Sequence, residues 1–254
     1  MVSSASSSQT APGPARPVLE LENIVKRREK GDQVFELRVP SLQVGAGEFV
    51  VIAGESGCGK STLLDMLGLV LSPTSGDRFL LRSGSGREHA ILGLSSGRLA
   101  ALRRSELGYV LQTGGLLPFL SVRDNVLLPC KINGRHDRHG PAMDLCERLK
   151  ITAQLHKKPQ FLSGGQRQRA AIARALAHQP PIVLADEPTA AVDKLTAREI
   201  CNTFKELTRM MGVTLLMVTH DVDLVRDMMD RSYSFTISRP ENHHTISVCT
   251  EDKP

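Results

Sequence analysis

A glycine-rich octapeptide, GESGCGKS at residues 54–61, carries the clearest chemical signal in this chain. It fits the pattern G-x-x-x-x-G-K-[ST], in which the glycines let backbone N–H groups turn inward around an anion. Lys60 can reach the β- and γ-phosphates of a nucleotide, and the Ser61 hydroxyl can ligate Mg²⁺. The segment therefore predicts a phosphate site formed by Gly54, Glu55, Ser56, Gly57, Cys58, Gly59, Lys60, Ser61 and Thr62.

The segments on either side of this loop are the ones that the motif requires. The apolar run 49–53 predicts a buried strand, and residues 61–67 predict a helix. The start of that helix adds partial positive charge where the phosphates would lie. A chance match in a loop that binds no nucleotide is the alternative, and the flanking elements make it much the weaker one.

Polar side chains also follow three other predicted strands. Gln112 follows residues 107–111, Asp186 and Glu187 follow the apolar run 182–185, and His220 ends the strand that begins at Val213. Buried strands that alternate with helices indicate an α/β fold with a mostly parallel sheet and helices on both faces. Because ligands bind at the carboxyl ends of such strands, we expect these side chains beside the phosphate loop.

This set of side chains matches the needs of nucleotide hydrolysis, which are charge neutralisation, a metal and an oriented water. Ser61 and Asp186 are predicted to hold Mg²⁺, with Gln112 bridging metal and water. Glu187 is predicted to be the general base, and His220 to contact the γ-phosphate or to hold Glu187 in line. A solvated turn at Asp186-Glu187-Pro188 and a capped core histidine are the simpler alternatives, and each is favoured for its residue taken alone. Together with the phosphate loop, in the expected order, both become much the weaker alternatives.

Composition restricts the possible classes of protein. The chain has 254 residues and 41% hydrophobic content, which are enough for one sizeable domain. Its net charge of +5 is compatible with nucleic acid, anionic lipid or a nucleotide and does not distinguish among them. It has no Trp and two Tyr, so base-stacking platforms for nucleic acid are not expected. Five scattered cysteines suggest no disulfide framework and favour the cytosol. No apolar run approaches the length of a membrane span.

The order of segments predicts one domain over residues 18–237 with a tail at each end. Residues 1–17, rich in Ser, Ala and Pro, are expected to be a disordered tail rather than a secretory signal. Short antiparallel strands are expected before the phosphate loop, and a small helical subdomain over residues 113–175. Residues 238–254 are expected to be a polar C-terminal tail.

Shorter elements are expected at several other places. They are a hairpin with a surface loop at 78–97, a helical turn at 99–105, helices at 143–151, 195–211 and 223–231, and a last strand at 233–237.

Taken in order, these motifs resemble the nucleotide-binding subunits of ATP-binding cassette (ABC) transporters over residues 19–231. The octapeptide resembles their Walker A loop, Gln112 their Q-loop, residues 182–187 their Walker B strand, and His220 their switch histidine. LSGGQ at 162–166 is similar to the family signature. Within the family the chain looks most like the lipoprotein-releasing (LolD-like), macrolide-exporter (MacB-like) and FtsE-like group. The resemblance implies a RecA-like core with a mostly parallel sheet, an antiparallel β subdomain and a helical subdomain.

The resemblance also implies a mechanism and a set of partners. Two subunits would form a head-to-tail homodimer around two Mg-ATP, each ATP lying between one Walker A loop and the other subunit's signature. The signature contacts would come from Ser163, Gly164, Gly165 and Gln166. ATP hydrolysis would power a separate integral-membrane permease, with an external lipoprotein or adaptor as a further candidate partner. The subunit would lie peripherally on the cytoplasmic face of the inner membrane, and the transported substrate stays open between export and extraction of lipoproteins.

Two other functions remain alternatives. An FtsE-like regulatory ATPase would signal across the membrane without transport, and nothing in the sequence separates it from a transporter. A soluble ABC ATPase of DNA repair or ribosomes is less favoured, because the chain has neither an inserted coiled coil nor a second cassette.

Three positions depart from the family pattern. The aromatic residue that usually stacks on adenine corresponds to Arg28, whose guanidinium can stack on the base or simply lie in a solvated basic turn. Cys58 lies at a variable position of the loop. Its side chain is either a small spacer or a thiol that alkylating reagents can reach. The D-loop at 190–193 begins with two alanines, which predicts altered contacts across the dimer.

Overall fold

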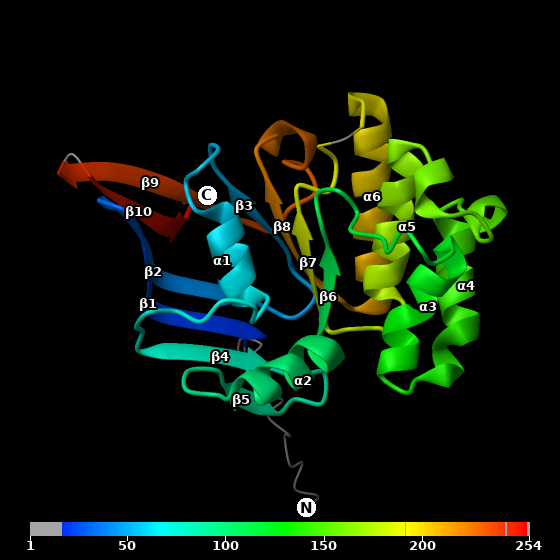
Figure 1. The fold of residues 1–254 in the computed structure, drawn as a ribbon, viewed down its shortest axis with the longest axis horizontal. Coiled ribbons are helices and arrows are strands. Elements are labelled where there is room, and N and C mark those ends of the chain that lie inside the picture. The colour runs from blue at the N-terminus through cyan, green and yellow to red at the C-terminus, as the bar shows by residue number, and fades with distance from the viewer. Residues whose placement is uncertain (1–16, 191, 242, 253–254) are drawn as a thin grey trace, which may run out of the picture.

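One continuous sheet of ten strands runs through the molecule in the order β5-β4-β1-β2-β10-β9-β3-β8-β7-β6 (Figure 1). The computed structural model describes residues 17–190, 192–241 and 243–252. The disordered tail expected at the N-terminus therefore lies outside the described residues, except for Pro17.

The parallel half of the sheet comprises four short, apolar strands, β3 (Phe49–Ala53), β6 (Leu107–Val110), β7 (Ile182–Asp186) and β8 (Thr214–Thr219). Alternate residues of β3 enter two different cores. Val50 and Ile52 pack with α1 (Lys60–Leu67), whereas Phe49 and Val51 pack with α5 (Gly164–Leu176) and α6 (Lys194–Met211). The sheet is therefore buried on both faces, as its near-continuous apolar strands predict.

The antiparallel half comprises β1 (Leu19–Lys30), β2 (Gln33–Val44), β4 (Arg78–Arg82) and β5 (Glu88–Ala90). A two-residue turn that contains Gly31, at φ 61°, joins β1 to β2. The expected hairpin within residues 78–97 is confirmed as β4–β5. α2 (Ser96–Glu106) is a full helix instead of the expected helical turn, and the Ser95 hydroxyl caps its N-terminus.

The C-terminal segment is not the polar tail that its composition predicts. β9 (Arg231–Glu241) pairs in parallel with β3, and β10 (His244–Glu251) lies between β9 and β2 and so joins the two halves of the sheet. Small polar residues misled the prediction, because Ser247 and Cys249 alternate onto the buried face of β10. The helix expected over 223–231 is also wrong: only the short 3₁₀ turn η4 (Val222–Leu224) forms there.

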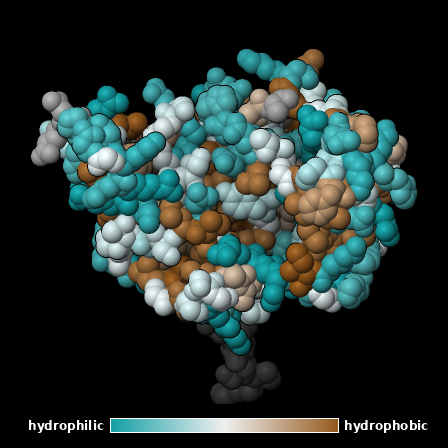
Figure 2. Space-filling model, viewed as in Figure 1, coloured by the Kyte–Doolittle hydropathy of each residue, from teal (hydrophilic) through white to brown (hydrophobic). Residues whose placement is uncertain are grey.

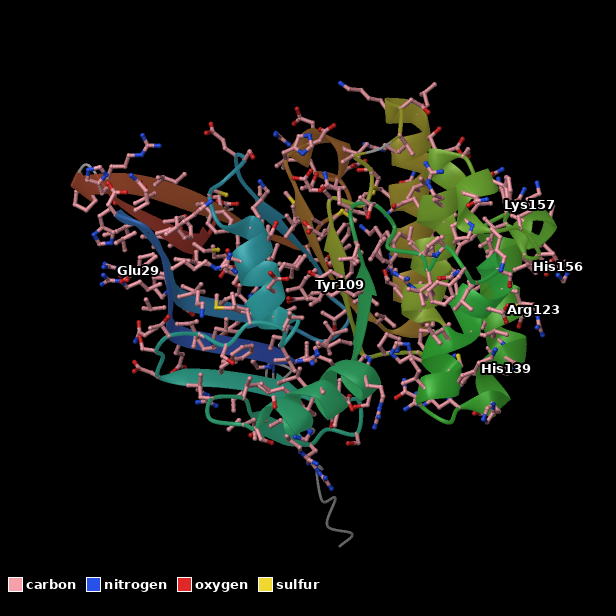
Figure 3. All side chains as sticks on the ribbon, in the orientation of Figure 1. Glu29, Tyr109, Arg123, His139, His156 and Lys157 are labelled. Atoms are coloured by element: carbon pink, nitrogen blue, oxygen red, sulfur yellow. The ribbon has the colours of Figure 1, made fainter. Side chains whose placement is uncertain are left out.

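The helices α3 (Val122–Ile132) and α4 (His139–Arg148) pack with α5 beside the outermost strand, β6. Between them lie the 3₁₀ turns η1 (His136–Arg138), η2 (Thr152–Gln154) and η3 (Pro159–Phe161). Hydrophobic atoms gather on the visible face where this helical part meets the sheet (Figure 2). Tyr109 on β6 lies at this junction, whereas Arg123 and His139 lie at the outer edge (Figure 3).

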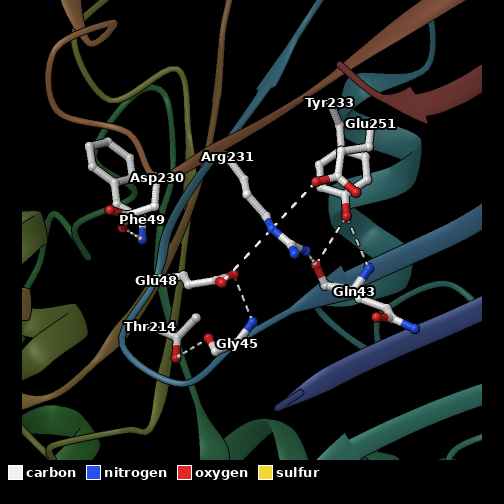
Figure 4. A network of polar contacts seen from close by, with 9 residues as sticks. All are labelled: Gln43, Gly45, Glu48, Phe49, Thr214, Asp230, Arg231, Tyr233 and Glu251. Carbon is white, nitrogen blue, oxygen red and sulfur yellow. Dashed lines mark hydrogen bonds and ion pairs between the residues drawn. The ribbon is translucent and has the colours of Figure 1, made fainter. Parts of the chain in front are cut away.

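A polar network holds four chain segments together at the ends of the strands away from the phosphate loop (Figure 4). The Tyr233 hydroxyl on β9 donates to the Gln43 carbonyl oxygen at 3.0 Å and accepts from the Gln43 N–H at 3.1 Å. Arg231 donates to the same carbonyl at 3.0 Å and lies 3.4 Å from Glu251 and 3.9 Å from Glu48. The network therefore fixes β9 and β10 relative to β2 and β3.

We expect Tyr233→Phe to lower the free energy of unfolding by about 1 kcal/mol, because it removes two hydrogen bonds from a fully buried ring. Tyr109→Phe is the matched control, since its hydroxyl makes no hydrogen bond within the described part of the chain. That control should change stability by less than about 0.5 kcal/mol. Denaturant unfolding of both variants measures the difference, and equal stabilities would contradict the role of the network.

Candidate nucleotide-binding site

A cavity of about 470 Å³ opens at the carboxyl ends of the parallel strands, next to the phosphate loop. The structure brings together there residues from four segments that lie far apart in the sequence. The cavity is lined by Arg28, Phe35, Ser56, Gly57, Gly59, Lys60, Ser61, Thr62, Gln112, Asp186 and Glu187.

The loop takes a shape that only glycine adopts without strain at two positions. Gly57 has φ 82° and Gly59 has φ 111°. Lys60 starts α1, and its ammonium donates to the carbonyl oxygens of Gly54 at 2.6 Å and Glu55 at 2.7 Å. The residue is 7% exposed, so the positive charge is held inside the loop at the start of a helix.

Two carboxylates face this ammonium across the cavity. Glu187 lies 3.9 Å from Lys60 Nζ and 3.1 Å from His220 Nδ1. Glu187 also has φ 41°, an unusual conformation for a residue other than glycine, and such outliers cluster at functional sites. Burial raises the pKa of Asp186, and the neighbouring carboxylates of Glu187 and Asp65 raise it further. The cavity thus concentrates negative charge that a bound cation would relieve.

The predicted metal ligands line one cavity. Ser61, Gln112 and Asp186 offer a hydroxyl, an amide and a carboxylate oxygen, which are the hard donors that Mg²⁺ prefers. The half-buried Asp186 carboxylate lines the cavity next to that of Glu187, and a cation would reduce the repulsion between these two negative charges. The donor set therefore fits Mg²⁺.

Phe35 is a cavity residue that the sequence reasoning missed. It lies on β2 directly opposite Arg28 on β1, and both line the cavity. A Cβ atom at Gly59 would come within 3.1 Å of Phe35 Cζ, so the ring lies against the phosphate loop. The turn at Gly31 was the available signal, because a two-residue hairpin pairs position 28 with position 35.

The signature residues lie apart from this cavity. None of Ser163, Gly164, Gly165 and Gln166 lines it. Ser163 caps the N-terminus of α5, where its hydroxyl accepts from the Gln166 N–H and the Gln166 amide oxygen accepts from the Ser163 N–H. Ser163 is exposed and Gly164 and Gly165 are half-buried, so the start of α5 lies at the surface. In the D-loop, Ala191 lies outside the described residues.

The chain belongs to the ABC transporter family, since the family pattern named ABC transporter matches residues 37–190. It is an ATPase cassette of that family. An ABC transporter ATP-binding protein of Thermotoga maritima is 42% identical over 213 residues, which are 83% of this chain and 88% of that protein. No helix in the described ranges is long and apolar enough to cross a bilayer.

Two other relatives belong to the predicted group. The lipoprotein-releasing system ATP-binding protein LolD of Saccharophagus degradans is 38% identical over 84% of this chain and 92% of its own length. The macrolide export ATP-binding/permease protein MacB of Hyphomonas neptunium is 39% identical over 81% of this chain, which spans 31% of that protein.

Solved structures show the same fold. A dimeric structure of the MJ0796 ABC transporter cassette matches with a TM-score of 0.73 and 34% identity, over 85% of this chain and 93% of the other. A post-hydrolysis dimer of MJ0796 bound to ADP and Pi matches with a TM-score of 0.71 and 33% identity, with the same coverage.

Cys58 is a packing residue within the phosphate loop. Its side chain is 1% exposed, and a Cβ atom at Gly54 would lie 2.6 Å from its Sγ atom. Burial raises the pKa of the thiol, so it stays protonated and unreactive at neutral pH. The small-spacer alternative therefore fits the structure better than a reachable thiol.

We expect iodoacetamide at neutral pH to leave Cys58 unmodified in the folded protein, because the thiol is both buried and protonated. The same reagent in denaturant should label all five cysteines, which are all buried in the fold. Peptide mass spectrometry distinguishes the two conditions. Rapid native labelling of Cys58 would show that the phosphate loop opens readily.

Proposed function

We propose that this cassette hydrolyses ATP in a head-to-tail homodimer and thereby drives a separate membrane permease. The observation that carries the proposal is the separation of the two nucleotide-binding motifs. The cavity holds the Walker A and Walker B residues, whereas the exposed N-terminus of α5 presents Ser163 and the signature glycines elsewhere on the surface. A two-fold partner supplies the missing signature to each cavity, and the MJ0796 cassette is itself dimeric.

The chemistry follows from the charges within the cavity. Lys60 moves from the loop carbonyl oxygens to the β- and γ-phosphates, whose negative charge it neutralises. Glu187 takes a proton from the attacking water, and His220, 3.1 Å from it, keeps the carboxylate aimed at that water. Mg²⁺ held by Ser61, Asp186 and Gln112 would neutralise charge on the phosphates when bound. Attack on the γ-phosphorus then yields ADP and phosphate.

The base of the nucleotide is proposed to stack on Phe35, with Arg28 on the opposite strand contributing charge. Both side chains line the cavity on the side of the antiparallel strands. An aromatic ring offers any base a flat apolar face, so this contact adds affinity with little choice between adenine and guanine.

The permease is proposed to dock in the apolar groove between β6 and the helical part. The groove has a volume of about 480 Å³ and is lined by residues that include Tyr109, Leu117, Leu128 and Ile132. Ile132 is 55% exposed although it is a large apolar side chain. Since β6 leads from this groove to Gln112, a partner seated there can sense the nucleotide. The cassette would thus lie peripherally on the cytoplasmic side of the membrane.

The group that contains LolD and MacB favours export or lipoprotein extraction as the driven process. An FtsE-like signalling role without transport uses the same ATP cycle and stays as the second candidate. The less favoured alternative, an ATPase without a membrane partner, gives no role to the apolar groove.

Co-purification of Glu187→Gln from detergent-solubilised membranes with Mg-ATP tests these candidates. Capture of ribosomal or DNA-binding proteins instead of a permease would contradict the proposal.

We expect Glu187→Gln to bind ATP normally and to lower the rate of hydrolysis by about 10²–10⁴-fold, because the amide cannot accept the proton from water. Lys60→Ala should instead weaken ATP binding about tenfold or more, since it removes charge-assisted contacts to the phosphates. Single-turnover assays and calorimetry separate the two effects. Near-normal turnover by Glu187→Gln would remove Glu187 as the base.

We expect Phe35→Ala to weaken both ATP and GTP binding about tenfold, because a stacking contact contributes roughly 1–3 kcal/mol. Arg28→Ala is the matched comparison on the opposite strand, and its effect should be smaller and should fade at high salt. Equilibrium titration with both nucleotides measures the change. A larger loss for Arg28→Ala would assign the stacking role to the guanidinium.

A further inference from the structure

The helical part holds the chain's excess of positive charge. Residues 113–178 contain eleven Lys and Arg against four Asp and Glu, whereas the whole chain has 32 against 27. The rest of the chain thus carries more acidic than basic side chains. Such an asymmetry in charge indicates a surface that binds an anionic partner.

Part of this charge forms one exposed cluster at the outer edge of the helical part. The start of α3 lies along residues 155–158, since the Val122 N–H donates to the Lys157 carbonyl oxygen and the Arg123 N–H to that of Leu155, both at 2.9 Å. Figure 3 shows Arg123, His156 and Lys157 together at this edge. All three are exposed, and none forms an ion pair with another described residue.

Two exposed aromatic rings belong to the same edge. Phe119 is 69% exposed and Phe161 is 66% exposed, although large apolar side chains are usually buried. Lys158 connects them: its ammonium donates to the Phe119 carbonyl oxygen at 2.6 Å, and its own carbonyl accepts from the Phe161 N–H at 3.0 Å. The edge cluster therefore consists of Phe119, Arg123, His156, Lys157, Lys158 and Phe161.

We propose that the edge cluster binds the anionic headgroups of a lipid bilayer, with Phe119 inserting at the interface. Exposed aromatic rings among cations suit a membrane surface, because the rings enter the headgroup boundary while the cations meet lipid phosphates. The nearby acid Asp124 accepts from Ser121, pairs with Lys131 and also attracts Arg123. It leaves Lys157 and Lys158, which form no ion pair with another described residue, as the uncompensated cations of the cluster.

The position of the cluster supports a membrane as its partner. Phe119 follows the groove residue Leu117 by two positions, so the cluster continues the face proposed to receive the permease. The inference rests on that proposed function for its orientation. It adds a direct contact between this chain and lipid, which gives the cassette an affinity for the membrane before it meets a permease.

Fluorescence tests the insertion without any permease, because the chain contains no Trp. We expect Phe119→Trp to shift its emission to the blue with phosphatidylcholine vesicles that contain phosphatidylglycerol, and not with pure phosphatidylcholine. High salt should reverse the shift. The control Val70→Trp, at a position that is 65% exposed and outside the helical part, should show no shift with either vesicle.

Charge reversal tests the cations. Arg123→Glu with Lys157→Glu should weaken co-sedimentation with the anionic vesicles about thirtyfold or more, since each surface cation contributes about fivefold to membrane affinity. Arg87→Glu with Arg98→Glu makes the same change of charge at exposed positions outside the helical part and should leave binding unchanged. Unaltered ATPase activity of both double variants would confirm that they fold.

Several results would overturn the lipid contact. They are no blue shift for Phe119→Trp, an equal shift with neutral vesicles, equal effects of the two charge reversals, or binding to single-stranded nucleic acid without binding to vesicles. Because these assays need neither ATP nor a permease, their failure would leave the proposed ATPase dimer untouched. If the cassette bound vesicles but did not dimerise with Mg-ATP, the result would instead contradict the proposed function alone.

Discussion

The structure depends on holding one glycine-dependent loop at the carboxyl edge of a buried parallel sheet. The loop needs positive φ at Gly57 and Gly59, and its inner side packs through the buried thiol of Cys58. The C-terminal strands also hold the loop in place, since the Ser247 hydroxyl on β10 donates to the Cys58 carbonyl oxygen at 2.5 Å. A Cβ atom at Gly54 would lie 2.9 Å from a ring carbon of Phe235, so β9 leaves no room for a side chain there.

The charges of the site give the proposed dimer around Mg-ATP its physical basis. Lys60 lies opposite Glu187, and burial raises the pKa of Asp186 in the same cavity. A bound cation would stabilise the two carboxylates, and a bound anion would stabilise the ammonium. Mg-ATP would supply both the cation and the anion. The γ-phosphate of such a ligand would still face open solvent on one side, which an exposed helix N-terminus of a partner can cover.

Much of the fold and most of the site could be predicted because their signals are local. The phosphate loop and the polar residues at the carboxyl ends of β6, β7 and β8 are set by adjacent residues. Phe35 could not be recognised in the same way, since its place in the cavity depends on pairing across β1 and β2. β10 was missed because its burial comes from neighbouring strands rather than from apolar composition.

The most direct test of the composite site is the molar mass of Glu187→Gln in light scattering. With Mg-ATP the mass should double, and with ADP it should stay that of a monomer, because in the proposed dimer the γ-phosphate joins the two motifs. Adding Gly164→Glu, which places a carboxylate where the partner's phosphate is expected, should keep the protein monomeric while each chain still binds ATP. A dimer that forms regardless of nucleotide, or one that survives Gly164→Glu, would contradict the account.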